Sequence, residues 1–141
     1  MGNLTVNGLV AAHHVLIPCE MSVLAFEGVG DLIDTLAQIN DRLNPELDVL
    51  GVLFTRVDGR NVQMNDLIVN NMRKYFAGEI FETRITINTA LNKSQLDGRP
   101  IFQFDPNSTG SKNYEKLAEE VIKKCEVRVK PDPVQVTSKA S

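Results

Sequence analysis

The chain has 141 residues, of which 43% are hydrophobic and 23% charged, with a formal net charge of -3 at pH 7. This length predicts one folded domain with a sizeable core. The acidic balance argues against a generally basic nucleic-acid binder but leaves room for a local basic patch. There is no long apolar run and no signal-peptide pattern, so we expect no membrane partner and a cytoplasmic location with two free cysteine thiols.

Helix and strand patterns alternate along the chain. We expect helices at residues 4–12, 25–43, 64–76, 89–96 and 112–125, and strands at residues 15–17, 49–55 and 80–85. This alternation predicts an α/β fold of three layers, with a mainly parallel sheet flanked by helices. The domain is expected to span residues 1–125. Residues 126–141 contain two prolines among mixed polar residues and are expected to form a disordered tail.

Two of the expected helices carry apolar residues at helical spacing and should pack on the core. The longest helix contributes Leu32, Ile33, Leu36, Ile39 and Leu43, and the last helix contributes Tyr114, Leu117, Ala118, Val121 and Ile122. Ser111 is the expected N-cap of the last helix, and Gly78 stands where a C-terminal cap of the helix at residues 64–76 would be.

The first expected strand is a short apolar run, residues 15–17, that Pro18 closes. The run is typical of a strand buried on both faces of a parallel sheet. Such a strand needs a neighbour on each side, and one short helix is all that precedes it in this sequence. An uncovered strand edge pairs readily with another chain, so we expect self-association or pairing with a complementary N-terminal fragment.

The sequence lacks the residues of a phosphate-transfer site. A phosphate-cradling loop reads G-x-x-x-x-G-K-[ST] between a strand and a helix, and this chain has none. His13 and His14 are neighbours whose side chains point opposite ways, with no cysteine or carboxylate at ligand spacing, so no metal site is expected. Cys19 has no identifiable base. We predict no catalytic residues in this chain.

Several motifs occur in an order and spacing that resemble a known family. They are LTVNGL at residues 4–9, VLIP at 15–18, FEG at 26–28, LGVLFTRVDGR at 50–60, GRPI at 98–101 and DPNSTG at 105–110. Together they resemble the ParA/Soj-type partition ATPases, which are MinD-related and have a deviant Walker A motif. The resemblance implies the C-terminal half of such a protein, with a partial P-loop NTPase fold of Rossmann-like type that lacks the P-loop half.

The resemblance also implies a function. Proteins of this family bind ATP and magnesium, dimerise, coat the nucleoid, and move plasmid or chromosome cargo with a ParB-like centromere-binding partner. Their phosphate loop resembles K-G-G-x-G-K-T and their acidic motif D-x-P-P-S-L-G, and of these Gly2 alone is matched. We therefore expect no cofactor for the isolated chain and no ATP hydrolysis by it.

By resemblance, two loops lie on the side of the nucleotide base. Thr55, Arg56 and Asp58 follow the second strand, and Thr86 and Asn88 follow the third. In open α/β sheets, ligands bind beyond the carboxyl ends of the strands. For Asp58 the alternative is an Asp-Gly turn in which the carboxylate binds its own backbone, and for Asn88 it is a turn-forming asparagine.

Arg60 matches an arginine of the family that is implicated in binding DNA without sequence preference, through a phosphate contact. The alternative is a solvated surface arginine. Relatives carry I-P-R-N-V-R-L after the third strand, whereas this chain has Ile87 and Ala90 in place of the two arginines. Lys93, Arg99 and Lys112 are candidates to replace them.

Three interpretations remain open from the sequence. The chain is half of a partition-type ATPase, a non-catalytic interaction module, or a fragment without an independent role.

Overall fold

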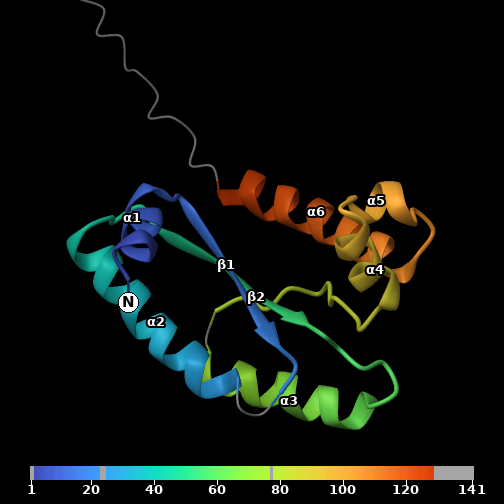
Figure 1. Cartoon of the computed structure of the whole chain (residues 1–141). Helices are drawn as coiled ribbons and strands as arrows, with labels where there is room; N and C mark the ends of the chain where they lie inside the picture. Colours follow the sequence, from blue (N-terminus) through green and yellow to red (C-terminus); the bar gives the residue numbers. More distant parts are fainter. Residues whose placement is uncertain (1, 23–24, 77, 129–141) are drawn as a thin grey trace, which may run out of the picture.

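The computed structural model describes residues 2–22, 25–76 and 78–128, and it belongs to the α/β class (Figure 1). The expected tail therefore lies, from residue 129 on, outside the described residues. Among the described residues, no helix combines the length and apolar character that crossing a bilayer requires. The elements in chain order are α1 Asn3–Ala11, β1 His14–Glu20, α2 Ala25–Arg42, β2 Asp48–Thr55, α3 Val62–Tyr75, α4 Thr89–Asp97, α5 Ile101–Phe104 and α6 Thr109–Arg128.

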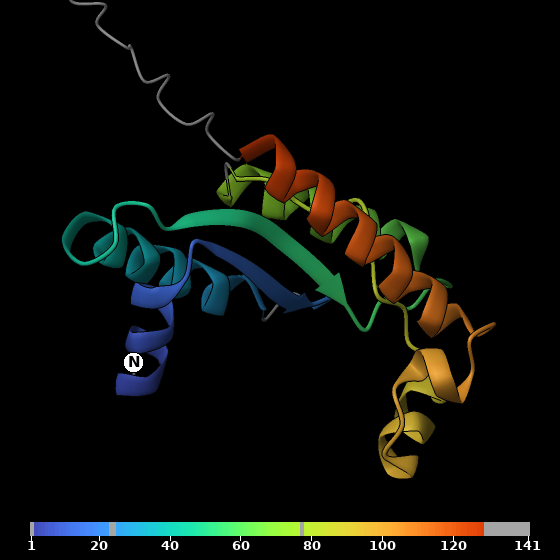
Figure 2. The same cartoon turned by 90° about the horizontal axis from the view of Figure 1, so that it is seen from above.

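The layers are a parallel pair of strands between two sets of helices. β1 pairs with β2 from His14 opposite Asp48 to Glu20 opposite Thr55. α1, α2 and α3 contribute to the core on one face of the pair, and α6 contributes to a second core on the other face (Figure 1). Figure 2 shows α6 running beside β2, with α4 and α5 grouped near the carboxyl end of that strand. The predicted arrangement of helices around a parallel sheet is confirmed.

β2 is the most buried strand, and its side chains serve both cores. Val52 and Phe54, each 0% exposed, belong to the core with α2 and α3, whereas Leu50 and Leu53 belong to the core with α6. In a regular strand Leu50 and Val52 would share a face. A bulge in the pairing with β1 separates them, since Leu16 pairs with Gly51 directly after Val15 pairs with Val49.

Glycine is required at position 51 of this bulge. Its φ is +142°, and a Cβ atom there would lie 2.5 Å from the carbonyl oxygen of Glu79. An L-residue would therefore suffer both backbone strain and a clash with a backbone atom that cannot move easily. The close approach brings the 79–87 segment directly against β2.

β1 is longer than expected, because the strand continues past Pro18 to Glu20. Met21 N–H donates to the Thr55 carbonyl and Asp48 N–H donates to the His13 carbonyl, each over 3.0 Å. Odd-numbered residues of β1 thus direct their backbone groups toward β2, and even-numbered residues direct theirs toward the outer edge. The missing N–H of Pro18 costs no bond to β2, so the expected end of the strand at residue 17 was wrong.

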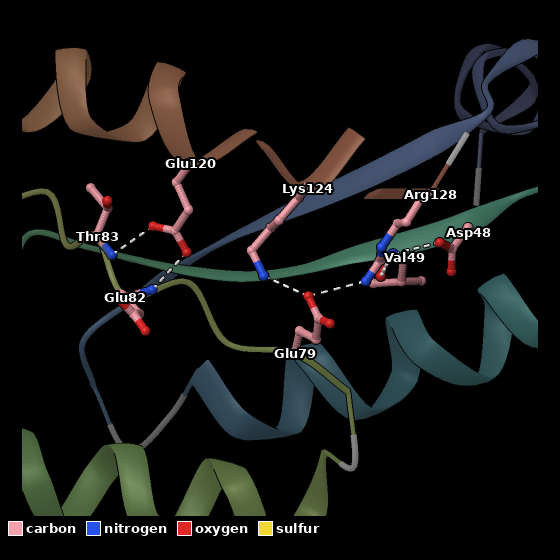
Figure 3. Close-up of polar contacts among 8 residues, drawn as sticks. All are labelled: Asp48, Val49, Glu79, Glu82, Thr83, Glu120, Lys124 and Arg128. Carbon is pink, nitrogen blue, oxygen red and sulfur yellow. Dashed lines mark hydrogen bonds and ion pairs between the residues drawn. The ribbon is translucent and has the colours of Figure 1, made fainter. Parts of the chain in front are cut away.

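The expected third strand at residues 80–85 does not form. The ends of this segment bind the edge of β2 that faces away from β1, through Val52 N–H to the Glu79 carbonyl and Ile85 N–H to the Phe54 carbonyl, both 2.9 Å. Between them, the N–H groups of Glu82 and Thr83 each donate over 2.9 Å to the carboxylate of Glu120 (Figure 3). Because the Glu120 side chain accepts these two backbone N–H groups, they do not bind β2, and the ladder of hydrogen bonds between the segment and β2 is interrupted at this point.

Four polar residues of α6 hold this segment and the start of β2. Asn113, Glu120, Lys124 and Arg128 follow one another at spacings of seven, four and four, so they form one stripe of the helix, here called the polar stripe. Lys124 Nζ lies 2.5 Å from Glu79 Oε2, and Arg128 Nη1 lies 2.5 Å from Asp48 Oδ2 (Figure 3). The Lys124 and Arg128 side chains are largely covered, with 18% and 20% exposed, whereas their partners Glu79 and Asp48 are 54% and 51% exposed.

The bounds of α6 also differ from the expectation. The helix begins at Thr109, and Ser108 Oγ accepts the N–H of Ser111, so Ser108 rather than Ser111 occupies the capping position. It continues past residue 125 to Arg128, whose ion pairs lie in the folded domain. Gly78 is not the C-cap of α3, since that position is Phe76.

Four residues expected in the core are exposed instead, Ala118 among them. Leu117 and Val121 do pack against the second core, and so does Cys125. Tyr114, Ile122 and Leu43 are 41%, 58% and 54% exposed. The apolar part of α6 that faces the core is thus the narrow stripe of Leu117, Val121 and Cys125. The other apolar side chains of the helix, at positions 114, 118 and 122, turn to solvent.

We expect Glu120→Gln to destabilise the protein by roughly 1–3 kcal/mol at pH 7, because a carboxylate that accepts two backbone N–H groups is replaced by a neutral side chain. Burial raises the pKa of Glu120, but the N–H donors of Thr83 and Glu82 and the nearby Lys124 lower it below its ordinary 4.5 overall. A lowered pKa in the folded state contributes stability above the unfolded-state pKa. This contribution is lost as the pH falls from about 4.5 through the folded-state pKa.

Urea unfolding followed by circular dichroism at pH 7 and at acidic pH measures this effect. The variant should lose less stability between the two pH values than the wild-type chain. Glu115→Gln, at an exposed position of the same helix, is the matched control. Equal acid sensitivity in the wild-type and Glu120→Gln proteins would contradict the assignment.

Candidate nucleotide-base pocket

Polar side chains from four parts of the chain meet beyond the carboxyl end of β2. They surround a pocket of about 200 Å³ between β2, the 85–88 segment, α4 and α6. This is the place where open α/β sheets hold their ligands. The lining residues are Thr55, Arg56, Ile85, Thr86, Ile87, Asn88, Leu91, Asn92, Gln95 and Tyr114. Four of the five predicted base-side residues are therefore brought together: Thr55, Arg56, Thr86 and Asn88.

The end of β2 forms one wall of the pocket. Thr55 Oγ1 donates to the Cys19 carbonyl over 3.4 Å, which ties the end of β2 to β1. Arg56 follows with a φ of +52°, a left-handed conformation that residues other than glycine seldom adopt. Its Nε lies 2.6 Å from Glu20 Oε1. The one guanidinium group that lines the pocket is thus already paired with a carboxylate at the end of β1.

The 86–88 segment forms the opposite wall. Thr86 donates twice to Asn113 Oδ1, from its backbone N–H over 3.0 Å and from its hydroxyl over 2.8 Å. Asn88 Oδ1 accepts the N–H of Ala90 over 2.8 Å and thereby caps the N-terminus of α4. Asn88 was expected either at a base edge or in a turn, and its oxygen serves the helix cap.

Asp58 lies outside the pocket lining and binds its own loop. Its Oδ1 accepts the backbone N–H of Arg60 over 3.0 Å, and its Oδ2 lies 2.8 Å from Arg60 Nη2. The hydrogen bonds from Arg60 lower the pKa of Asp58 to about 2. Asp58 Oδ2 also accepts a hydrogen bond from Asn61 Nδ2 over 3.5 Å. This arrangement matches the alternative given for Asp58 from the sequence, in which the carboxylate binds the backbone of its own turn.

The two DNA-binding candidates are both at the surface. The Arg60 side chain is 89% exposed and lies beside Asn61, Val62 and Met64 at the start of α3. Lys93 is exposed on α4. Of the remaining substitutes considered from the sequence, Arg99 pairs with Asp97 and its guanidinium lies 5.4 Å from the centroid of the Phe104 ring. Lys112 is exposed near the start of α6.

Sequence reasoning missed several residues of the site. Tyr114 was assigned to the core but lines the pocket with 41% of its surface exposed. Asn92 and Gln95 follow Asn88 at spacings of four and three, a pattern that places all three on one side of α4 and was available in the sequence. Asn113 had no such signal, because its partner Thr86 is 27 residues away in the chain.

The chemical character of the pocket suits a flat, neutral, polar ligand. Hydroxyl and carboxamide groups supply hydrogen-bond donors and acceptors, and Tyr114 supplies an aromatic surface. Within the described ranges, no three histidine, cysteine, aspartate or glutamate residues lie close enough to hold a metal ion. The pocket offers no cluster of cations for a phosphate group, since Arg56 already pairs with Glu20.

Known proteins share both sequence and fold with this chain. A family model described as an AAA domain matches residues 1–49. The chromosome-partitioning ATPase Soj of Treponema pallidum is 35% identical over 122 residues, which are 86% of this chain and 48% of that protein. The chromosome-partitioning ATPase Soj of Thermus thermophilus is 38% identical over 119 residues, 84% of this chain and 47% of that protein. The chain thus spans less than half the length of these relatives.

A solved structure has the same arrangement of elements. The cobyrinic acid a,c-diamide synthase of Mycobacterium smegmatis superimposes with a TM-score of 0.69 and 25% identity, covering 86% of this chain and 42% of that one. The same enzyme has been solved with a bound ATP analogue and magnesium, and that structure matches 70% of this chain and 45% of that one, with a TM-score of 0.57 and 29% identity. As the sequence motifs predicted, this chain is a homologue of the Soj/ParA chromosome-partitioning ATPases.

Proposed function

We propose that this chain forms the base side of a partition-type ATPase and provides part of a nucleotide site rather than a complete one. The observation that carries the proposal is the pocket beyond β2, where Thr55, Thr86 and Asn88 meet Tyr114 at the usual ligand position of an α/β sheet. The Soj relatives are chromosome-partitioning ATPases, and the structural relative binds an ATP analogue with magnesium. These relatives support ATP as the nucleotide.

In this proposal the base and the phosphates are held by different sequence segments. The pocket contributes hydroxyl and carboxamide groups, whereas the G-x-x-x-x-G-K-[ST] pattern that cradles phosphates is absent from these 141 residues. Stabilising a transferring phosphoryl group needs positive charge aimed at its oxygens. ATP and magnesium therefore belong to the complete site of the family, and the chain alone does not turn ATP over.

We expect adenosine to shift the amide NMR signals of a 15N-labelled chain at residues 55–56 and 85–92, with an affinity that is roughly millimolar because base contacts alone contribute. ATP incubated with the same protein should release no phosphate above the buffer background. Ribose alone is the control ligand and should shift none of these signals. Shifts confined to other surfaces, or phosphate release that persists through purification, would overturn the proposal.

DNA binding by Arg60 is a further part of the proposed function. Its exposed guanidinium is suited to a phosphate contact, which gives affinity without base recognition. Asp58 pairs with it through two nitrogens, so a DNA phosphate competes with that carboxylate. Lys93 on α4 is the second proposed contact. The positions of Ile87 and Ala90 carry no charge in this chain.

Salt titration of DNA binding tests the role of Arg60. We expect Arg60→Ala to reduce the slope of log affinity against log salt by about 1, because one phosphate contact is lost. Asp58→Asn should strengthen binding, since it removes the competing carboxylate. Arg73→Ala, in the last turn of α3, is the control for a surface arginine. An unchanged slope in Arg60→Ala would remove this residue from the site.

The outer edge of β1 favours a second candidate function, that of an interaction module. Within the described residues no strand pairs with this edge, and Leu16 and Glu20 direct their backbone groups toward it. Pro18 interrupts the row of donors on the same edge. We infer that another strand adds here, from a second copy or from a segment that carries the phosphate-binding motifs. A ParB-like protein is the proposed partner of the assembled ATPase.

Light scattering over a range of protein concentrations tests this interaction. We expect the average mass to rise with concentration, because an open parallel edge is a template for pairing. A monomer at every concentration, with no mass increase when a polypeptide bearing the family's phosphate loop is added, would contradict the proposal.

A further inference from the structure

We propose that Asn113 is the positioning residue of the base pocket, and that it sets which hydrogen bond the pocket offers to a ligand. The inference rests on the proposed function of the pocket. Asn113 does not line the pocket itself. It reaches Thr86 from α6, and its Oδ1 accepts both the backbone N–H and the hydroxyl of that residue, over 3.0 and 2.8 Å.

The backbone explains why Thr86 needs this partner. Val57 N–H donates to the Ile85 carbonyl and Ile87 N–H donates to the Val57 carbonyl, each over 3.0 Å. Residues 85 and 87 therefore direct their backbone groups toward residue 57, and the N–H of Thr86 points the other way. No strand of the described sheet lies on that side. The Asn113 carboxamide takes the place of a strand and fixes the segment at the pocket wall.

The second hydrogen bond fixes the direction of the Thr86 hydroxyl. A carbonyl oxygen such as Oδ1 can only accept, so the hydroxyl must donate its single proton to Asn113. Its lone pairs then remain for the pocket, and Thr86 acts as an acceptor there. The ligand group that complements it is an N–H donor, such as the exocyclic amine of a purine.

Asn88 complements this polarity two residues later. Its Oδ1 is taken by the N–H of Ala90, which leaves the Nδ2 group as the donor end of this side chain. Thr86 and Asn88 together present an acceptor and a donor. An aminopurine edge, with an amine beside a ring nitrogen, has the matching donor and acceptor.

Two substitutions separate the positioning role from a merely structural one. Asn113→Leu removes the acceptor, whereas Asn113→Asp keeps an acceptor oxygen within reach of both Thr86 donors. The readout is the ratio of affinities for adenosine and for purine riboside, which lacks the exocyclic amine, measured from NMR shifts of the pocket amides. Lys116→Leu, at an exposed position of α6, is the control for placing leucine on this helix.

We expect wild type, Asn113→Asp and Lys116→Leu to favour adenosine by roughly fivefold, the factor that one hydrogen bond provides. Asn113→Leu should bring the ratio close to one and speed hydrogen exchange of the Thr86 amide. A purely structural role would weaken both ligands alike and leave the ratio unchanged, and this outcome would overturn the inference while leaving the base pocket in place. No pocket shifts with either nucleoside in the wild-type chain would overturn the proposed function and this inference together.

Discussion

The polar stripe of α6 is the interaction on which the arrangement of this fold depends. β2 has two edges, and β1 occupies one of them with a parallel ladder that a single bulge interrupts. The segment along the other edge has ladder bonds near its ends, and Glu120 takes the N–H groups between them. Hydrogen bonds of this kind favour one arrangement, because breaking them leaves the backbone donors of the segment and two largely covered cationic side chains without these partners. Ion pairs continue the contact between α6 and this side of the sheet as far as the start of β2. Lys124 and Arg128 both pair with Glu79, and Arg128 also pairs with Asp48.

This construction places the candidate site at the far end of the stripe. Asn113 is the member nearest the carboxyl end of β2, and it holds Thr86 where α4 begins. On the opposite wall, the Arg56–Glu20 pair joins the ends of the two strands. The pocket is therefore bounded by elements far apart in sequence, each held by a contact that also stabilises the fold. Its polar groups are neutral apart from a guanidinium that is already paired, which fits a base better than a phosphate.

Homology and local chemistry together support the proposed partial site. The Soj relatives are more than twice as long as the matched segment. The G-x-x-x-x-G-K-[ST] pattern of a phosphate-binding loop does not occur in these 141 residues. Arg60, the residue that resemblance connects with DNA, is bound by Asp58 in the same loop. The hydrogen bonds from Arg60 lower the pKa of Asp58 to about 2, so the carboxylate is charged at neutral pH and pairs with the arginine at the protein surface.

The sequence by itself determined the order of the main helices and the two strands, because apolar periodicity and the Asp58–Gly59 turn are local signals. It also determined the absence of a phosphate loop and the family resemblance, which depend on residue identity alone. The tertiary structure decided the interrupted third strand, the passage of β1 through Pro18, the exposure of Tyr114 and the role of Asn113. The interrupted strand depends on the contact of Glu120 with Thr83 across 37 residues, and the role of Asn113 depends on its contact with Thr86 across 27 residues. Such contacts form only when the helices pack on the strands. The periodicity of the sequence does not predict them, because it does not indicate which side chain will bind backbone groups that a neighbouring strand would otherwise bind.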